Sequence, residues 1–146
     1  MSITWIITVL CIIAVTLAYV AWNYIRIRKM PEGTADMVDM AAIIRSGANA
    51  FMKTEYKTIT IVVALISLAL SLFVEKTSGI TFLVGAAMSS CACVLGMKSA
   101  TYANVRTANK ARESMSIGDT VKVALCGGSI SGLSVQAFGM LGLVAV

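Results

Sequence analysis

The chain has 146 residues and a formal net charge of +5, but only 13% of its residues are charged and 58% are apolar. An ordinary soluble domain carries about 25% charged residues, so this composition, with a mean hydropathy of +0.87, argues against a soluble fold. The positive net charge raises a nucleic-acid partner as an alternative, but the cations are confined to segments between long apolar runs, which argues against that class.

Four long uncharged runs account for the apolar composition. Each is 17 to 25 residues long, which is the length that an α-helix needs to cross the hydrocarbon core of a bilayer. A charge in the middle of a bilayer costs about 2.5–3.5 kcal/mol on insertion scales, and no charge interrupts these runs. We therefore predict an all-α, polytopic membrane protein. Its single membrane region, residues 1–146, is expected to have four transmembrane helices, at about residues 2–25, 58–74, 78–97 and 123–146.

The first run is interpreted as a retained span. No basic residue precedes it, since the first is Arg26, and it is too long for the apolar segment of a secretory signal peptide. Its aromatic residues Trp5, Trp22 and Tyr24 lie near its two ends, which is typical of anchors at the membrane interfaces. This pattern predicts an outer, lipid-facing position.

The connection between the first two runs is predicted to contain an amphipathic helix. Pro31 and Gly33 break the preceding helix, and Thr34 is a candidate N-cap. Apolar residues then recur every three or four positions toward the second span. Asp36 and Asp39 lie three residues apart in the first turn. Two carboxylates alone make a poor Mg²⁺ site, so we favour the interpretation that they complement the helix dipole.

The second and third runs are joined by a predicted turn at Glu75–Gly79. The third run has few helix breakers after Met97, so its helix is expected to continue well beyond the membrane. Arg106 and Lys110 lie one turn apart on this extension. They would suit an anion or an acidic protein surface, but we favour a solvated or docked helix face.

The closing stretch, "CGGSISGLSVQAFGMLGLVAV", is rich in glycine. Gly127 and Gly132 have the spacing of a phosphate-binding P-loop, but Leu133 stands where the lysine is required and no strand precedes it. On a helix, the small residues form a stripe on one face, and the third run has a similar stripe. Small residues let helix backbones approach closely in lipid. The predicted packing glycines are Gly85, Gly96, Gly128, Gly132, Gly139 and Gly142.

The distribution of charge predicts the orientation. Eleven of the twelve Lys and Arg residues lie in the two long connections, and only Lys76 lies in the turn between the second and third runs. Cytoplasmic loops carry the excess of Lys and Arg, so we expect both long connections in the cytoplasm and the N-terminus outside the cell membrane. The four cysteines all lie inside predicted spans and lack metal-site spacing, so we expect neither a disulfide framework nor a zinc site.

Three stretches, "PEGTADMVDMAAIIRSGANAFMKTEYKTI", "GAAMSSCACVLGMKSATYANVRTANKAR" and "VALCGGSISGLSVQAFGMLGL", carry a family resemblance. In order and spacing they resemble the first cytoplasmic loop, the third helix with its extension and the start of the fourth helix of the membrane-bound, ion-pumping inorganic pyrophosphatases. The resemblance implies a homodimer with about sixteen spans per subunit. It also implies hydrolysis of cytoplasmic pyrophosphate, export of H⁺ or Na⁺, several Mg²⁺ ions and, in some members, K⁺.

The aspartate motifs that carry catalysis in this family do not occur in the chain. Residues Gly47–Phe51, Asn104, Arg106, Gly128 and Gly132 match family motif positions, and we assign them structural roles. No catalytic, metal-binding or substrate-binding residue is predicted. The spans contain no charged residue for an ion relay, and the seven acids are too scattered for multi-metal chemistry.

We therefore predict the N-terminal outer-ring segment of such a pump, inactive alone and binding no Mg²⁺ or K⁺ itself. Its partners would be the bilayer and the remaining helices. No polar residue follows Leu141, which suggests a chain cut within or just after the fourth span. The alternative is a small non-enzymatic membrane scaffold related to the pump. The overall resemblance slightly favours Na⁺ over H⁺ as the pumped ion.

Overall fold

The computed structural model describes residues 3–146 and contains four α-helices. They are α1 (Ile3–Lys29), α2 (Ala35–Phe73), α3 (Lys76–Ser114) and α4 (Ile117–Ala145). All four are long and apolar enough to cross a membrane, and residues 3–146 contain no strand. The predicted all-α fold with four membrane-spanning helices is confirmed.

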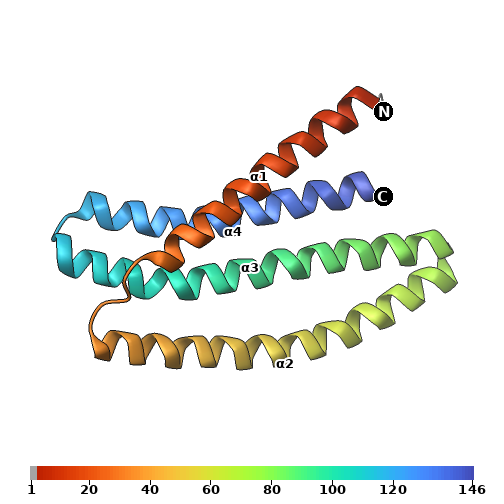
Figure 1. The fold of residues 1–146 in the computed structure, drawn as a ribbon. Helices are drawn as coiled ribbons and strands as arrows, with labels where there is room; N and C mark the ends of the chain where they lie inside the picture. Colours follow the sequence, from red (N-terminus) through yellow and green to blue (C-terminus); the bar gives the residue numbers. More distant parts are fainter. Residues whose placement is uncertain (1–2) are drawn as a thin grey trace.

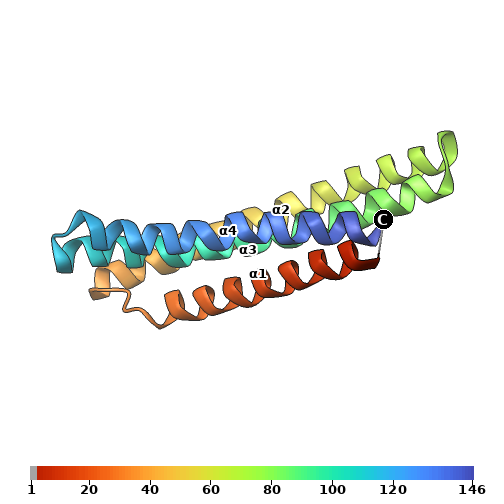
Figure 2. The ribbon, with the colours of Figure 1, turned by 90° about the horizontal axis from the view of Figure 1, so that it is seen from above.

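Three of the helices form a layer and the fourth crosses it. α3 lies in the middle, with α2 along one side and α4 along the other, whereas α1 packs across one face of α4 and reaches α3 only near its own end (Figures 1 and 2). The α1–α2 and α3–α4 connections lie at one end of the bundle, and the α2–α3 turn lies at the other (Figure 1). Eleven of the twelve Lys and Arg residues lie on the helix segments that flank these two connections, at residues 26–57 and 98–122.

α2 and α3 are much longer than a membrane is thick. Each has 39 residues, which at 1.5 Å per residue is about 58 Å, against a hydrocarbon core of about 30 Å. The amphipathic segment and the second span are thus one continuous helix. Thr34 holds the N-cap position, but its side chain makes no capping hydrogen bond. Gly33 has φ +105°, a backbone conformation that favours glycine.

The turn between α2 and α3 is shorter than predicted. Only Val74 and Glu75 lie between the helices, and residues 76–79, expected in the turn, form the start of α3. A Cβ on Gly79 would clash with Ser71 Oγ and lie 2.8 Å from the Ser67 carbonyl oxygen. The buried Ser67 hydroxyl donates a 3.0 Å hydrogen bond to the Gly79 carbonyl. This close approach lets the chain reverse within two residues.

The apolar core is small and lies where α1 meets α3 and α4. Its buried members are Val20, Ile27, Ala103 and Ile130. Buried hydroxyls add direct links between helices, because Ser99 Oγ donates a 2.9 Å hydrogen bond to the Gly127 carbonyl. Packing and hydrogen bonding, rather than hydrophobic burial, drive helix association in lipid, so a small core is sufficient here.

Candidate functional site

The described residues do not supply a metal site. Within residues 3–146 no group of three or more His, Cys, Asp or Glu side chains lies close enough to hold a metal ion. Asp36 is in the first turn of α2 and Asp39 lies one turn further, and both are exposed. Organised polar chemistry is found instead at the junction of α1, α2 and α3, and a groove lies between α3 and α4.

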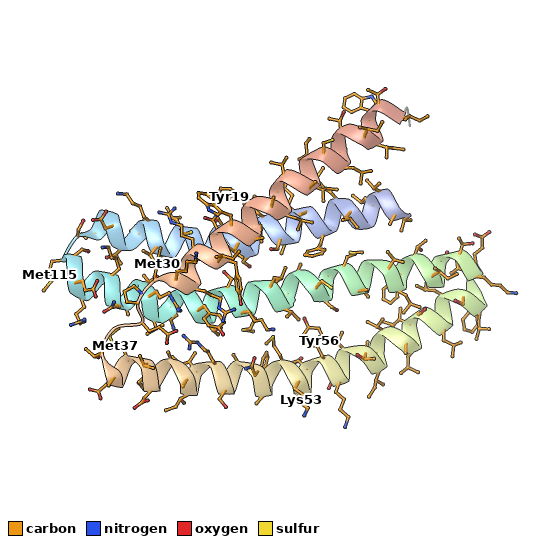
Figure 3. The ribbon with its side chains drawn as sticks, viewed as in Figure 1. Tyr19, Met30, Met37, Lys53, Tyr56 and Met115 are labelled. Atoms are coloured by element: carbon orange, nitrogen blue, oxygen red, sulfur yellow. The ribbon has the colours of Figure 1, made fainter. Side chains whose placement is uncertain are left out.

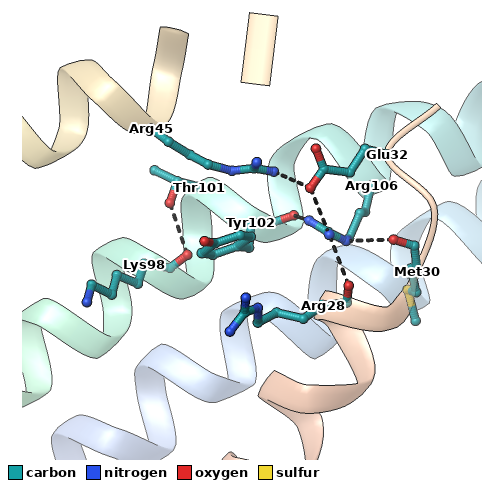
Figure 4. Close-up of polar contacts among 8 residues, drawn as sticks. All are labelled: Arg28, Met30, Glu32, Arg45, Lys98, Thr101, Tyr102 and Arg106. Atoms are coloured by element: carbon teal, nitrogen blue, oxygen red, sulfur yellow. Dashed lines mark hydrogen bonds and ion pairs between the residues drawn. The ribbon is translucent and has the colours of Figure 1, made fainter. Parts of the chain in front are cut away.

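The first feature is a set of five residues that we call the arginine cluster: Arg28, Glu32, Arg45, Tyr102 and Arg106 (Figure 4). Tyr102 lies at its centre. The guanidinium carbons of Arg28, Arg45 and Arg106 lie 5.4, 4.5 and 5.6 Å from the centroid of the tyrosine ring. Arginine is attracted to aromatic faces at these distances, so the ring brings together cations from three helices.

Arg106 holds the end of α1 against α3. Its guanidinium is buried and donates hydrogen bonds to the carbonyl oxygens of Met30 at 3.0 Å and Arg28 at 3.2 Å. Carbonyls at a helix C-terminus lack partners within the helix, and a cation there is favoured by the helix dipole. Of the two cations predicted on the α3 extension, Arg106 is therefore docked. The Lys110 side chain makes no hydrogen bond within residues 3–146.

Glu32, in the α1–α2 connection, bridges two of the arginines. Its Oε1 accepts hydrogen bonds from Arg45 Nη2 at 2.5 Å and from Arg106 Nη2 at 2.9 Å. The hydrogen bond from Arg45, together with the charges of Arg45 and Arg106, holds the pKa of the Glu32 carboxyl below its ordinary value of 4.5, although burial opposes this. Glu32 is therefore an ionised carboxylate at neutral pH.

The depressed pKa of Glu32 predicts a pH dependence of folding. Such a group stabilises the folded state fully above its ordinary pKa, and the contribution is lost as pH falls through the folded-state pKa. We expect the free energy of unfolding to fall more steeply for the native chain than for Glu32→Gln between about pH 6 and about pH 3. At neutral pH the variant should be less stable by about 1 kcal/mol. Unfolding by SDS in mixed micelles, followed by circular dichroism, measures both. Parallel pH curves would contradict the prediction.

The second feature is a groove of about 880 Å³ between α3 and α4. It lies on the face away from α1, because Cys126, Ile130 and Leu133 pack into the cluster with α1, whereas Ser131 and Val135 line the groove. Its wall is rich in small residues, which are Gly85, Ser89, Ala92, Cys93, Gly96, Ser131, Gly139 and Gly142. The two predicted small-residue stripes therefore contribute to the same groove.

The six predicted packing glycines divide into two groups. A Cβ on Gly96 would lie 2.6 Å from Ser131 Oγ, and one on Gly142 would lie 3.8 Å from Met88 Cγ, so these two glycines face the α3–α4 interface. For the other four, which are Gly85, Gly128, Gly132 and Gly139, no heavy atom of residues 3–146 other than the adjoining residues and backbone of their own helix lies within 4 Å of an added Cβ. Their predicted packing role needs partners outside the described residues.

Gly127 was not among the predicted packing residues, yet it is the most tightly enclosed glycine of α4. A Cβ there would clash with Ala103 Cβ and lie 3.9 Å from Ile27 Cδ1. The available signal was the spacing of Gly127, Ile130, Ser134 and Ala137, all buried, at intervals of three or four residues. This row faces the remainder of the bundle, whereas among the predicted packing glycines of α4 only Gly142 contacts it.

Two further polar contacts between helices lie within or beside the apolar segments. Asn23 of α1 is buried, and its Oδ1 accepts a 3.3 Å hydrogen bond from Cys126 Sγ of α4. Tyr56 lies between α2 and α3, and its hydroxyl donates a 2.8 Å hydrogen bond to the Ser90 carbonyl (Figure 3). Lys53, one turn earlier, points away from the bundle (Figure 3). Sequence patterns do not distinguish such buried polar residues from exposed ones.

Comparisons with known proteins identify relatives of this chain. The family model described as "Inorganic H+ pyrophosphatase" matches residues 13–146. A K(+)-stimulated pyrophosphate-energized sodium pump of Thermotoga maritima is 46% identical over 132 residues, covering 90% of this chain and 18% of the relative. A K(+)-insensitive pyrophosphate-energized proton pump of Methanosarcina mazei is 35% identical over 130 residues, covering 88% and 19%. The chain thus spans less than a fifth of the length of these relatives.

Proposed function

The chain belongs to the inorganic H+ pyrophosphatase family, and on this premise we propose that it works as the N-terminal segment of a larger pyrophosphate-energized ion pump. The observation that carries the proposal is the family match over residues 13–146, combined with coverage of only 18% of the sodium pump of Thermotoga maritima. Four helices with this match make the chain a multi-pass membrane protein. Most of the pump would lie in sequence beyond this segment.

The pump chemistry is assigned to those other parts. Phosphoryl transfer to water with metal ions needs clustered carboxylates, and the described residues provide no such cluster. Mg²⁺, which the family resemblance implies, does not fit the donor groups of residues 3–146. We propose that Mg²⁺, K⁺ and pyrophosphate bind elsewhere in the pump. The 46% identity to a K(+)-stimulated sodium pump supports Na⁺ as the exported ion and K⁺ as an activator.

The orientation and the partners follow from charge and packing. The α1–α2 and α3–α4 connections lie at one end of the bundle (Figure 1), and the segments that flank them, residues 26–57 and 98–122, carry eleven of the twelve Lys and Arg residues. This distribution supports a cytoplasmic location for that end in the cell membrane. The open face of Gly85, Gly128, Gly132 and Gly139 supports contact with further helices of the same subunit. The assembled pump would be a homodimer.

A comparison of hydrolysis and transport tests the proposal. We expect membranes that contain only the 146-residue chain to show no Mg²⁺-dependent pyrophosphate hydrolysis and no Na⁺ uptake into inverted vesicles. The complete pump should show both, and the pump lacking residues 1–146 should show neither. Co-expression of the two parts as separate chains serves as a control, since reassembly would restore activity. Hydrolysis by the chain alone, or full activity without it, would contradict the proposal.

A further inference from the structure

A pocket of about 400 Å³ lies between α1 and α4, toward the end of the bundle that holds the α1–α2 connection (Figure 1). Its wall on α1 runs from Tyr19 to Met30, both labelled in Figure 3, and its wall on α4 runs from Lys122 to Ser129. None of the five residues of the arginine cluster lines it. The pocket is therefore a feature separate from that cluster.

Two cations line the pocket, and both lie where an uncharged run meets the charged end of the bundle. Arg26 is the first charged residue after the first run, and Lys122 is the last one before the fourth run. The Arg26 guanidinium makes no hydrogen bond or ion pair within residues 3–146 and lies 6.0 Å from the centroid of the Trp22 ring. The Lys122 side chain is 78% exposed, and its ammonium pairs with Asp119 at 3.0 Å, which leaves two of its three N–H groups free. The pocket thus offers unused cationic donors at the membrane boundary.

A buried amide also lines the pocket, one turn deeper in the membrane than Arg26. Asn23 is only 2% exposed. Its Oδ1 accepts the hydrogen bond from Cys126 Sγ, whereas its Nδ2 makes no hydrogen bond within residues 3–146. Among those residues the only fully enclosed side-chain nitrogen or oxygen without a partner is Arg45 Nε, so Asn23 Nδ2 is not closed off from the pocket. Buried polar groups in native proteins seldom lack a partner, and an acceptor in the pocket would supply one.

We propose that this pocket binds an anionic phospholipid. Its phosphate lies between Arg26 and Lys122, since guanidinium groups match phosphate oxygens and hydrogen bonds between charged partners are the strong ones. An ester carbonyl oxygen of its glycerol backbone accepts a hydrogen bond from Asn23 Nδ2. The exposed side chains of Tyr19 and Leu125 lie deeper than the two cations and contact the start of an acyl chain.

The order of groups along the pocket favours a lipid over a soluble phosphate. Cations, amide and apolar side chains follow one another from the membrane surface inward, as phosphate, ester and acyl chain do in a phospholipid. Inorganic phosphate offers the same oxygens to Arg26 and Lys122, but it has no ester to reach Asn23. The site goes beyond the proposed pump function, because it requires only that α1 and α4 cross the membrane.

Nanodiscs that contain the chain provide the test. Phosphatidylglycerol is titrated into phosphatidylcholine discs, and its retention by the chain is measured by native mass spectrometry. Arg26→Gln and Lys122→Gln are each expected to weaken retention about fivefold, because a cation near an anionic membrane surface contributes about 1 kcal/mol. Arg28→Gln is the matched control, since it makes the same change about 200° further around α1, outside the pocket. It should change retention little.

Two further measurements identify the ligand. Ether-linked phosphatidylglycerol lacks the carbonyl oxygen and should be retained several-fold less than the ester-linked lipid; equal retention would overturn the role of Asn23. Inorganic phosphate is titrated by calorimetry into the chain in phosphatidylcholine discs. Saturable phosphate binding that Arg26→Gln weakens, without selective retention of phosphatidylglycerol, would overturn the lipid assignment. Circular dichroism confirms that each variant keeps its helix content. If Arg26→Gln and Arg28→Gln change lipid retention alike, the proposal is wrong.

Discussion

Replacing Arg106 by alanine is expected to lower the free energy of unfolding of the chain by about 3–4 kcal/mol. The change removes four hydrogen bonds, of which two reach the end of α1 and one reaches Glu32. Because only 4% of the Arg106 side chain is exposed, water cannot easily replace these partners. α1 meets α3 only near this point, so its end should loosen from the bundle.

SDS unfolding in mixed micelles, followed by circular dichroism, measures the loss. Arg112→Ala is the matched control, because it removes the same side chain six residues later on α3. The Arg112 side chain is 53% exposed, and its closest carboxylate, that of Glu113, is 3.9 Å away. It donates to a single side chain, since its guanidinium hydrogen-bonds to Asn109 Oδ1 at 3.1 Å. This control should change stability by no more than about 1 kcal/mol.

Arg106→Lys separates the charge of Arg106 from its geometry. Lysine keeps the charge but cannot reach Glu32 and two carbonyls in one plane, so it should recover only part of the loss. A full recovery by lysine would show that charge alone holds α1. An alanine variant as stable as the Arg112→Ala control would contradict the structural role of Arg106.

The helices could be predicted from the sequence because the features that indicate a span lie within the span itself. Run length and the absence of charge identify a span without any knowledge of its neighbours. The predicted fourth span, 123–146, accordingly lies almost entirely within α4, Ile117–Ala145. The turn at residues 75–79 was less well predicted, since the Ser67–Gly79 contact that shortens it joins two helices.

The role of Arg106 could not be read from the sequence for a related reason. Its partners Arg28, Met30 and Glu32 are 74 to 78 residues away. They meet it only because the α1–α2 connection folds back onto α3. A pattern on a single helix shows that Arg106 and Lys110 share a face, but it does not show which of them meets another element. Asn23 is similar, because its acceptor role depends on Cys126 of α4.

The glycines show what a small-residue stripe can and cannot predict. A stripe indicates that another backbone can approach closely, but it does not identify the neighbour. Gly96 and Gly142 have packing neighbours within the described chain, whereas Gly128 and Gly132 do not. Gly127, which has the closest neighbour on α4, lies beside the stripe rather than in it.

Gly127→Leu and Gly128→Leu are expected to have different effects on the stability of the isolated chain. Gly127→Leu should destabilise it by about 1–3 kcal/mol, as overpacking typically does, because its side chain would collide with Ala103 and Ile27. Gly128→Leu places its Cβ more than 4 Å from every heavy atom of residues 3–146 outside its own stretch of helix. It should leave stability unchanged or raise it by up to about 1 kcal/mol, since leucine favours helix over glycine. SDS unfolding of the two variants in parallel provides the comparison.

In the complete pump both substitutions should be harmful. Gly128→Leu tests the proposed packing face, because it should be tolerated in the isolated chain but harmful in the pump. If further helices cover Gly128 and Gly132, leucine at either position should reduce the yield of assembled pump and its pyrophosphate hydrolysis, although the isolated segment tolerates it. The readouts are the amount of folded pump on size-exclusion chromatography and the activity per folded molecule. A Gly128→Leu pump that assembles and turns over normally would place this face against lipid. The small residues there would then need another explanation, because close approach of backbones is the property that distinguishes glycine from leucine in a membrane helix.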